Sequence, residues 1–159
     1  MNTIIRRANK NDINRLLDLL GQVLNIHVKL RPDIFKNDTT KYRKEELIHM
    51  VGDDNNPIYV ICDDKEVLGY AFCQIRTSRV SHLLKRNKTF YIDDFCIDEK
   101  VRRQHLGQTL FDYLKQEAKR LDCDEITLNC WTDNKAAKEF YKKMGFNARS
   151  EIMEFAIKK

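Results

Sequence analysis

Hydrophobic positions recur along the chain with two periods, and their order predicts a mixed α/β fold. Alternating or short apolar runs predict strands at residues 3–7, 58–62, 67–77, 89–97, 125–131 and 150–157. Apolar spacings of three and four predict helices at about residues 11–26, 41–51, 106–121 and 135–144. The turn at residues 63–66 requires antiparallel pairing, whereas the later strand–helix–strand run requires a parallel crossover. We therefore expect a central mixed sheet with helices on both faces, in one domain of residues 1–159.

The strand at residues 89–97 is strongly apolar but carries two adjacent acids, Asp93 and Asp94. A strand this apolar is a poor fit to a solvated sheet edge, so we expect it at the centre of the sheet. Strict alternation of side chains places Asp93 and Asp94 on opposite faces. At most one of the two carboxylates is then expected to face a given ligand.

A basic loop follows this strand and leads into a helix that begins near Leu106. One face of this helix is apolar and consists of Leu106, Leu110, Phe111, Leu114, Ala118 and Leu121. The first N–H groups of a helix and its positive end both attract anions. The sequence therefore predicts an anion site at the start of this helix.

Composition narrows the class of protein without identifying its chemistry. The chain has 159 residues, 42% hydrophobic and 33% charged, as in one soluble globular domain. A net charge of +5, spread along the chain, gives little support to nucleic-acid binding. No apolar run is long enough to span a membrane and none resembles a signal peptide, so we expect a cytoplasmic protein that binds no membrane. The five cysteines and four histidines lack metal-site spacing, which favours core thiols and no metal.

Two motifs resemble those of the GCN5-related N-acetyltransferases, the GNAT superfamily. The run from Arg102 to Gly107 (RRQHLG) stands where that superfamily has Gln/Arg-x-x-Gly-x-Gly/Ala, with His105 at the first glycine. The run from Asn134 to Phe146 (NKAAKEFYKKMGF) matches a second motif in full. Either motif alone is weak, whereas two in register at the usual separation are specific. The resemblance covers most of the chain and is strongest from Phe90 to Phe146.

The resemblance implies a GNAT-type fold and acetyl transfer from acetyl-coenzyme A, as co-substrate, to a primary amine in a ternary complex. The pantetheine arm would run along the backbone of Phe95, Cys96 and Ile97. The diphosphate would bind backbone N–H groups of Arg102, Arg103, Gln104, His105, Leu106, Gly107 and Gln108. Asn134 would reach the pantetheine region, and Tyr141 would lie near the thioester sulfur. A homodimer is also compatible with the resemblance.

His105 is the one clear departure from the first motif. A side chain at a position that needs positive φ costs about 1 kcal/mol, although histidine tolerates this conformation better than most residues. We therefore expect coenzyme binding to be weakened or reshaped rather than lost.

The acceptor side follows less directly from the residues. Members of the superfamily usually build the acceptor pocket from their first two helices, so candidate lining residues are His27, Arg31, Tyr42 and Glu46, together with the irregular connection at residues 27–40. That connection could equally be a plain helix–helix linker.

An alkyl amine has a pKa near ~10 and must lose a proton before it can attack a thioester. Asp93 is the first candidate for the base and Asp94 the second, acting directly or through water. Either acid could instead attract the cationic substrate or belong to a structural pair. A backbone N–H near Ile97 could stabilise the oxyanion. Cys96 as an acyl-carrying nucleophile has little support, because no histidine is paired with it in the sequence.

Tyr141 is the candidate acid that protonates the leaving thiolate. The alternative is a core aromatic residue, because Tyr141 shares a helix face with Ala137 and Met144. The match of its Phe-Tyr pair to the family motif favours the functional interpretation.

Three functions remain to be compared. The run from Phe90 to Phe95 (FYIDDF) resembles the diamine acetyltransferases, which favours a small cationic amine or polyamine as acceptor, with a peptide amine or an aminoglycoside still open. The alternative is a catalytically idle acetyl-CoA-binding sensor or interaction module, motivated by His105. A nucleic-acid-binding domain ranks last.

Overall fold

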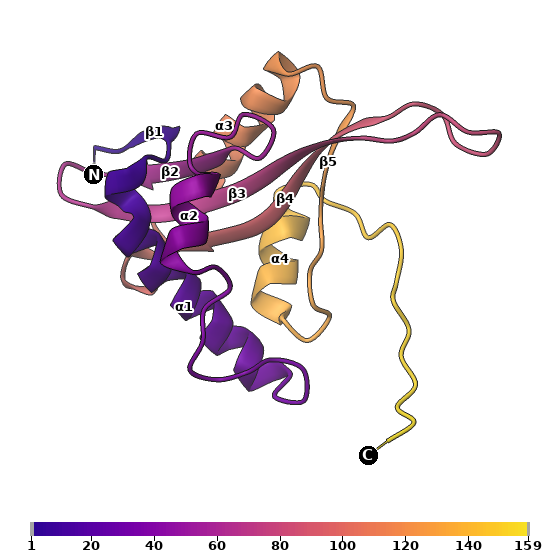
Figure 1. Ribbon diagram of the computed structural model, residues 1–159, viewed down its shortest axis with the longest axis horizontal. Coiled ribbons are helices and arrows are strands. Elements are labelled where there is room, and N and C mark those ends of the chain that lie inside the picture. Colours follow the sequence, from indigo (N-terminus) through magenta and orange to yellow (C-terminus); the bar gives the residue numbers. More distant parts are fainter. Residues whose placement is uncertain (1, 159) are drawn as a thin grey trace. The chain divides into compact units, whose positions relative to one another are not determined.

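The computed structural model describes residues 2–158, whose five strands form one open sheet in the order β1-β2-β3-β4-β5 (Figure 1). The strands are β1 (Ile4–Arg7), β2 (Ile58–Cys62), β3 (Val67–Thr77), β4 (Lys88–Ile97) and β5 (Glu125–Leu128). The helices are η1 (Lys10–Asp12), α1 (Ile13–Leu30), α2 (Lys44–Met50), η2 (Glu99–Val101), α3 (Leu106–Arg120) and α4 (Lys135–Lys143). The chain forms two compact units, one up to Asn129 and one from Cys130 onward.

The topology of the sheet confirms the predicted mixed arrangement. Strands β1 to β4 pair antiparallel in sequence order, and β5 pairs with β4 in parallel. The acid-bearing strand β4 thus has a neighbour on each side, as its apolar pattern predicts. Helices α1 and α2 lie on one face of this sheet and α3 lies on the other (Figure 1).

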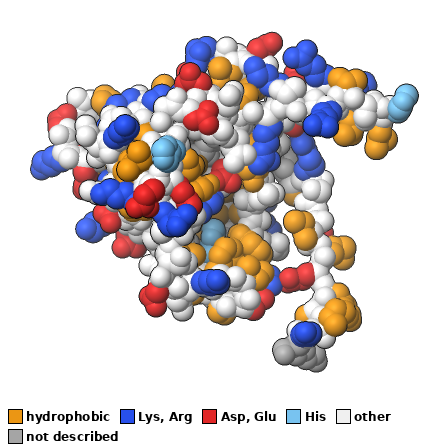
Figure 2. Space-filling view, in the orientation of Figure 1, with side chains coloured by type: hydrophobic (Ala, Val, Ile, Leu, Met, Phe, Trp, Pro, Cys, Tyr) orange, Lys and Arg blue, Asp and Glu red, His pale blue; other side chains and the backbone are white. Residues whose placement is uncertain are grey.

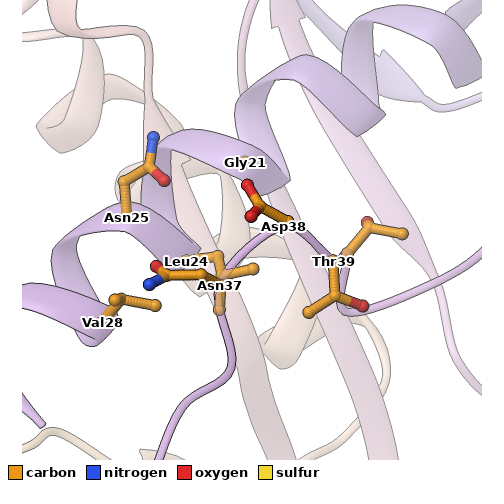
Figure 3. Close-up of a pocket in the computed structure, with 8 residues that line it drawn as sticks. Gly21, Leu24, Asn25, Val28, Asn37, Asp38 and Thr39 are labelled. Carbon is orange, nitrogen blue, oxygen red and sulfur yellow. The ribbon is translucent and has the colours of Figure 1, made fainter. Parts of the chain in front are cut away.

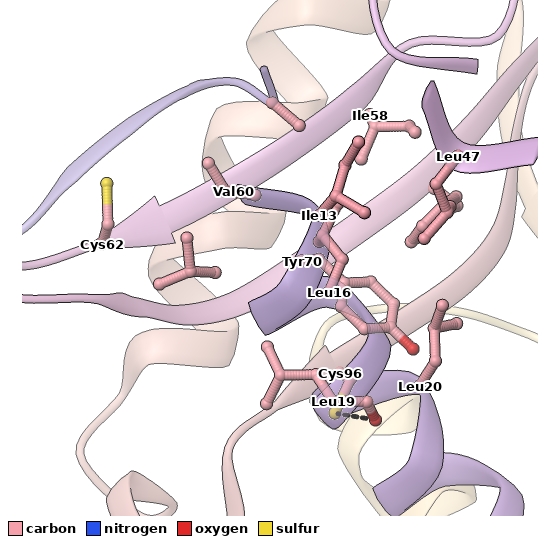
Figure 4. Packing of buried hydrophobic residues seen from close by; sticks show 13 residues of the cluster. Ile13, Leu16, Leu19, Leu20, Leu47, Ile58, Val60, Cys62, Tyr70 and Cys96 are labelled. Atoms are coloured by element: carbon pink, nitrogen blue, oxygen red, sulfur yellow. Dashed lines mark hydrogen bonds between the residues drawn. The ribbon is translucent and has the colours of Figure 1, made fainter. Parts of the chain in front are cut away.

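Alternation along β2 assigns its side chains to the two faces. Val60 belongs to the core cluster beneath α1, where Leu16, Leu19 and Leu20 are almost completely buried (Figure 4). Burying one such leucine contributes roughly 1.5–3 kcal/mol. Tyr59 lies on the opposite face of the sheet, where its ring packs edge-on against Tyr113 of α3 with centroids 5.6 Å apart. The Tyr59 hydroxyl also donates to Glu117 Oε2 at 3.0 Å.

The ends of several elements differ from the sequence prediction. Asn11 does not cap the first helix: Asn9 caps the short helix η1 with a capping box, and α1 starts only at Ile13. Helix α1 then continues to Leu30, beyond the predicted end near Ile26, because nothing before Pro32 interrupts it. Helix α2 and strand β5 are both shorter than predicted.

The predicted last strand, residues 150–157, is not formed. These residues lie outside any helix or strand, and their side chains are exposed. A strand needs a neighbouring strand to satisfy its N–H and C=O groups, and alternation in sequence does not supply one.

A β-bulge interrupts the pairing of β3 with β4 at Asp93. Phe72 is opposite Asp94 and Cys73 is opposite Ile92, so Asp93 is the extra residue. On its other side, β4 pairs with β5 only as far as Ile92. The bulge therefore coincides with the point where β4 and β5 separate.

Gly69 allows β3 and β4 to approach closely just beyond the bulge. A Cβ atom at this position would lie 2.6 Å from the Cys96 carbonyl oxygen and 2.6 Å from Ile97 Cδ1. Gly21, in the middle of α1, is the opposite case, because a Cβ there would meet no atom within 4 Å.

Replacing Gly69 by alanine is expected to lower the free energy of unfolding by about 1–3 kcal/mol, because the new methyl group overlaps backbone. The matched substitution Gly21→Ala is expected to raise it by about 0.5–1 kcal/mol through better helix propensity. Urea unfolding of both variants measures the difference, and equal effects of the two substitutions would contradict the proposed close approach.

Candidate active site

Two carboxylates on β4 share one cation. Lys41 Nζ lies 3.2 Å from Asp93 Oδ2 and 3.1 Å from Asp94 Oδ2. The prediction that strict alternation separates the two acids onto opposite faces is therefore wrong. The bulge at Asp93 breaks the alternation and lets both carboxylates reach the same ammonium.

Two tyrosines complete the hydrogen bonding of this acid pair. Tyr42 donates its hydroxyl to Asp93 Oδ2 at 2.8 Å, and Tyr70 donates to Asp94 Oδ1 at 3.0 Å. Burial first, and then the nearby carboxylates, raise the pKa of Tyr42 and of Tyr70 well above the usual value. Both phenols are therefore protonated donors at neutral pH.

The cation of this cluster is fully charged. Burial alone would lower the pKa of Lys41, but Asp94 and Asp93 outweigh burial and raise it. The Lys41 side chain is 38% exposed, compared with 21% for Asp93 and 7% for Asp94. The ammonium thus closes the solvent side of a more deeply buried pair of carboxylates.

Two cavities open in the unit that carries these acids. One of about 240 Å³ lies beside Asp93 and is lined by Tyr42, Met50, Asp53, Asn56, Phe72, Cys73, Gln74 and Asp93. The other, of about 400 Å³, lies between α1 and the connection to α2 (Figure 3). Its lining consists of Gly21, Leu24, Asn25, Val28, Asn37, Asp38, Thr39 and Thr40. Residues 37–40 of the predicted 27–40 connection thus line a cavity, and their contact with a substrate stays a prediction.

The half of β4 beyond the bulge offers backbone groups on the side away from β3. The Asp98 N–H donates to Leu68 O at 2.8 Å, and antiparallel alternation then directs the N–H and C=O groups of Phe95 and Ile97 away from β3. The Ile97 carbonyl accepts a hydrogen bond from Arg102 Nε at 3.1 Å. This edge, where β5 does not pair, has the geometry to accept an extended ligand.

The loop before α3 has the backbone shape of an anion site. Arg103 and His105 both have positive φ, of 64° and 60°. His105 thus adopts the left-handed conformation expected at the position of the motif's first glycine. The first hydrogen bond of α3 runs from Thr109 N to His105 O at 3.0 Å, so the N–H groups of the preceding helical residues have no acceptor within the helix. These N–H groups suit a phosphate group.

A buried carboxylate, Asp98, fixes the start of this loop. Only 1% of Asp98 is exposed, and its carboxylate pairs with Arg15 of α1. Gln22 Nε2 donates to Asp98 Oδ1 at 3.1 Å, while Gln22 Oε1 accepts from the Glu99 N–H at 3.1 Å. The Lys100 N–H also donates to Asp98 Oδ1, at 3.2 Å. Helix α1 is thereby tied to the first residues after β4.

The second unit contains the remaining candidates, Asn134 and Tyr141. Asn134 caps α4, because its side-chain oxygen accepts from the Ala137 N–H at 3.2 Å. Gly145 follows this helix with φ of 102°, as predicted for its C-terminal cap. The Tyr141 ring packs edge-on against Phe140 and Phe146. The roles of Asn134 and Tyr141 toward the coenzyme stay predictions.

Of the predicted acceptor-side residues, Tyr42 hydrogen-bonds to the acid pair, and His27 interacts with Asp94 through charge alone. His27 stacks on Phe35 at 4.9 Å, and Arg31 forms an ion pair with Asp33. Glu46 caps the start of α2 through the Arg43 N–H at 2.9 Å. None of these three residues lines either of the two cavities described above.

Cys96 is unsuited to carry an acyl group. It is 4% exposed, and burial first, followed by the charge of Asp94, raises the pKa of its thiol to about 12. Its Sγ lies 3.8 Å from Leu19 O, inside the core (Figure 4). The structure therefore gives no support to Cys96 as an acyl-carrying nucleophile.

The family follows from comparison with known proteins. A model of the acetyltransferase (GNAT) family matches residues 21–146. The chain belongs to the GNAT family. It is 28% identical over 110 residues to glucosamine 6-phosphate N-acetyltransferase of Arabidopsis thaliana. The aligned stretch covers 68% of this chain and 69% of that protein. The GNAT protein described here is thus an acetyl-CoA-dependent N-acetyltransferase.

Solved structures agree with this assignment of the fold. A single-site mutant of the BH1408 protein from Bacillus halodurans superposes with a TM-score of 0.93 at 27% identity, covering 97% of this chain and 99% of that one. Aminoglycoside N-acetyltransferase AAC(6')-Iy, solved in complex with CoA, has a TM-score of 0.71 at 13% identity, over 98% and 94% of the two chains. The second similarity is one of fold.

The described residues contain neither a metal-binding cluster nor a membrane-spanning helix. Within residues 2–158 no group of three or more His, Cys, Asp or Glu side chains is arranged to hold a metal ion. Over the same range, no helix is both long enough and apolar enough to cross a membrane.

Sequence reasoning missed three participants in the site. Lys41 and Tyr70 reach the acid pair only through the fold, and nothing local in the sequence marks them. Asp98 did carry a signal, since an acid directly after an apolar strand and before an anion loop must find a partner if it is buried.

Replacing Asp98 by asparagine is expected to lower the free energy of unfolding by about 2 kcal/mol at pH 7, because charge-assisted hydrogen bonds are lost. Burial would raise the pKa of Asp98, but its bonds to Gln22, Lys100 and Arg15 lower it. The depressed pKa means that this stabilisation is present above the unfolded value, near ~4, and is lost as the pH falls through the folded pKa.

Urea unfolding of the wild type and of Asp98→Asn between pH 7 and pH 3 measures this difference. Asp18→Asn, an exposed acid on α1, is the control and is expected to change little. A difference that stays constant down to pH 3 would show that the Asp98 charge does not stabilise the fold.

Proposed function

We propose that this N-acetyltransferase acetylates a small cationic primary amine, and that Asp93 and Asp94 bind and deprotonate it. The observation that carries the proposal is Lys41. Its primary ammonium already lies within 3.2 Å of both carboxylates. The site therefore accommodates the chemical group that a substrate amine would bring.

The linings of the two cavities, of which the smaller lies beside Asp93, also favour a cationic acceptor without phosphate. Their linings include Asp38, Asp53 and Asp93 and no lysine or arginine, within the described residues. A phosphate-bearing amine, such as the substrate in the name of the Arabidopsis relative, needs a cationic partner for its phosphate. A volume of about 400 Å³ suits a small molecule, and the Asn and Thr side chains on its wall suit hydroxyl or amino groups.

Lys41 has to give up its place when a substrate amine binds to the carboxylates. The incoming ammonium takes over both ion pairs, so neither of the largely buried carboxylates is left without a cation after the exchange. Tyr42 and Tyr70 keep their hydrogen bonds and hold the two carboxylates in place during the exchange.

The reaction then follows from acid–base chemistry. Asp93 removes a proton from the bound ammonium, directly or through water, and the amine nitrogen attacks the thioester carbonyl carbon. The new N–C bond forms while negative charge moves to the carbonyl oxygen, where a backbone N–H near Ile97 stabilises it. The C–S bond breaks, and Tyr141 supplies the proton that turns the departing thiolate into the free thiol.

Phe95, Cys96 and Ile97 are proposed to bind the pantetheine arm through the backbone. The backbone at residues 102–108 is proposed to bind the diphosphate, with Asn134 near the pantetheine. Support comes from the part of β4 that does not pair with β5 and from the positive φ values at Arg103 and His105.

The first test measures free-thiol release from acetyl-CoA with diamines, polyamines, amino sugars with and without phosphate, and short peptides. Turnover is expected to be fastest with small polycationic amines, and lower with phosphorylated amino sugars. Preference for a phosphorylated amine would overturn the proposed acceptor class. Calorimetric binding of acetyl-CoA without thiol release from any amine would instead support an idle coenzyme-binding module.

The second test addresses the base and the acid. Asp93→Asn is expected to lower kcat by about 10²–10⁴-fold, with loss of the acidic limb of the pH profile, as for removal of a general base. Tyr141→Phe is expected to lower kcat with little change in the KM of acetyl-CoA. Asp112→Asn, an exposed acid on α3, is the control and is expected to retain full activity. An Asp93→Asn variant with wild-type kcat at every pH would remove Asp93 as the base.

A further inference from the structure

The ammonium group of Lys41 is held at the acid pair by several contacts. Its Nζ lies 3.2 Å from Asp93 Oδ2, 3.1 Å from Asp94 Oδ2 and 3.5 Å from Asp93 O. It also lies over the ring of Tyr42, 5.6 Å from the ring centroid, where a cation is attracted to the aromatic face. The end of this side chain therefore has a defined place beside the two carboxylates.

The residues next to Lys41 fix the segment that carries it. The Tyr42 ring stacks on Phe72 of β3 with centroids 5.5 Å apart, and its hydroxyl donates to Asp93 of β4. Thr40 Oγ1 donates to Tyr42 O at 2.9 Å. Lys41 thus lies on a stretch of chain that is attached to two strands of the sheet.

The proposed position of the coenzyme brings its acetyl group toward Lys41. Coenzyme A has its diphosphate and its thioester at opposite ends of the pantetheine arm. In the proposed function the diphosphate lies on the backbone of residues 102–108, and the arm follows β4 from Ile97 back to Phe95. An arm that continues in this direction brings the thioester to Asp94 and Asp93, which hold the Lys41 ammonium.

We propose that Lys41 is itself an acceptor, which the protein acetylates within one chain when acetyl-CoA is bound and no substrate amine is present. The Lys41 side chain is a primary alkyl amine, the same chemical group as the proposed substrate. It already occupies the carboxylates that bind that substrate. This modification rests on the proposed function, because it uses the same base and the same position of the coenzyme.

The reaction of Lys41 follows the steps proposed for a free amine. Asp93 takes one proton from the ammonium, and the Lys41 nitrogen attacks the thioester carbonyl carbon. The N–C bond forms, the C–S bond breaks, and Tyr141 protonates the departing thiolate. The nitrogen loses its second proton as the amide forms, and the thiol gains one, so one proton is left in excess, on Asp93.

Acetylation of Lys41 ends after one turnover, because an amide nitrogen is neither basic nor nucleophilic at neutral pH. A substrate amine that binds to Asp93 and Asp94 displaces the Lys41 ammonium and so protects it. Modification of Lys41 and turnover of a substrate are therefore alternative reactions at one pair of carboxylates.

Other lysines of the same chain serve as internal controls. Basic side chains are scattered over the face of the molecule in Figure 2, so acetyl-CoA in solution meets many amines. Lys115 on α3 has surroundings similar to those of Lys41: its Nζ lies 2.8 Å from Asp112 Oδ1 and 5.4 Å from the centroid of the Phe111 ring. The Lys115 side chain is 45% exposed, compared with 38% for Lys41. Lys115 therefore reports how fast a paired, partly exposed lysine reacts without the acid pair.

Mass spectrometry of peptides, taken before and after incubation of the full-length protein with acetyl-CoA alone, tests the proposal. Lys41 is expected to gain one acetyl group about 10²–10⁴-fold faster than Lys115, as for assistance by a general base. The rate is expected to stay constant when the protein is diluted, because the reaction occurs within one chain. Equal rates at the two lysines would overturn the proposal, as would a rate at Lys41 that falls on dilution.

Variants and a substrate amine separate the enzymatic reaction from chance acetylation. Asp93→Asn is expected to slow acetylation of Lys41 to the rate of Lys115, whereas Asp18→Asn, an exposed acid on α1, is the control and is expected to leave it unchanged. Lys41→Arg keeps the positive charge and is expected to abolish the single burst of free thiol that the wild type releases without an amine. In the wild type, a saturating amine that turns over is expected to protect Lys41, and undiminished labelling in its presence would contradict the shared site.

Failure of this modification and failure of the proposed function give different results. Thiol release with an added amine, while Lys41 stays unmodified without one, would overturn the modification alone. Acetylated Lys41 with no turnover of any amine would support the modification and overturn the proposed acceptor. An unmodified Lys41 together with no turnover would overturn both.

Discussion

One inserted residue in a β-strand determines the layout of the candidate site. The bulge at Asp93 turns two successive carboxylates toward one cation, which regular pleating forbids. It also lies where β4 leaves β5, so the strand beyond it carries backbone groups that do not pair with β5. In the proposed function, the carboxylates that act on the amine and the backbone that binds the coenzyme therefore begin at the same residue. A chain without the bulge would keep the same sheet order but would separate the two acids.

The segments around the bulge are joined by a close strand contact and by a buried carboxylate. Gly69 permits a close approach of β3 to β4, and Asp98 joins the end of β4 to α1 through Arg15 and Gln22. Helix α1 in turn is packed into the core beneath the sheet. The loop before α3 thus starts from Asp98, at a point where α1, β3 and β4 contact one another. The loop itself contains the two residues with positive φ, Arg103 and His105.

The order of helices and strands could be predicted from the sequence, because the spacing of hydrophobic residues differs between a helix and a strand. Strands β2 and β3, the start of α3 and the Asn134 cap all lie where the pattern places them. Long-range facts were out of reach: no local pattern shows that Lys41 meets β4, or that residues 150–157 have no neighbouring strand. The bulge was missed for a related reason, because an extra residue is visible only against the partner strand.

The buried cysteines have a consequence for an enzyme that releases a thiol at every turnover. Burial raises the pKa of Cys62, Cys73 and Cys96, so these sulfurs stay protonated at neutral pH. Thiol–disulfide exchange proceeds through the thiolate. Coenzyme A disulfide, formed when the product oxidises, therefore finds no reactive partner in the core. Burial in the sheet thus keeps the thiols of Cys62, Cys73 and Cys96 from exchanging with coenzyme A disulfide.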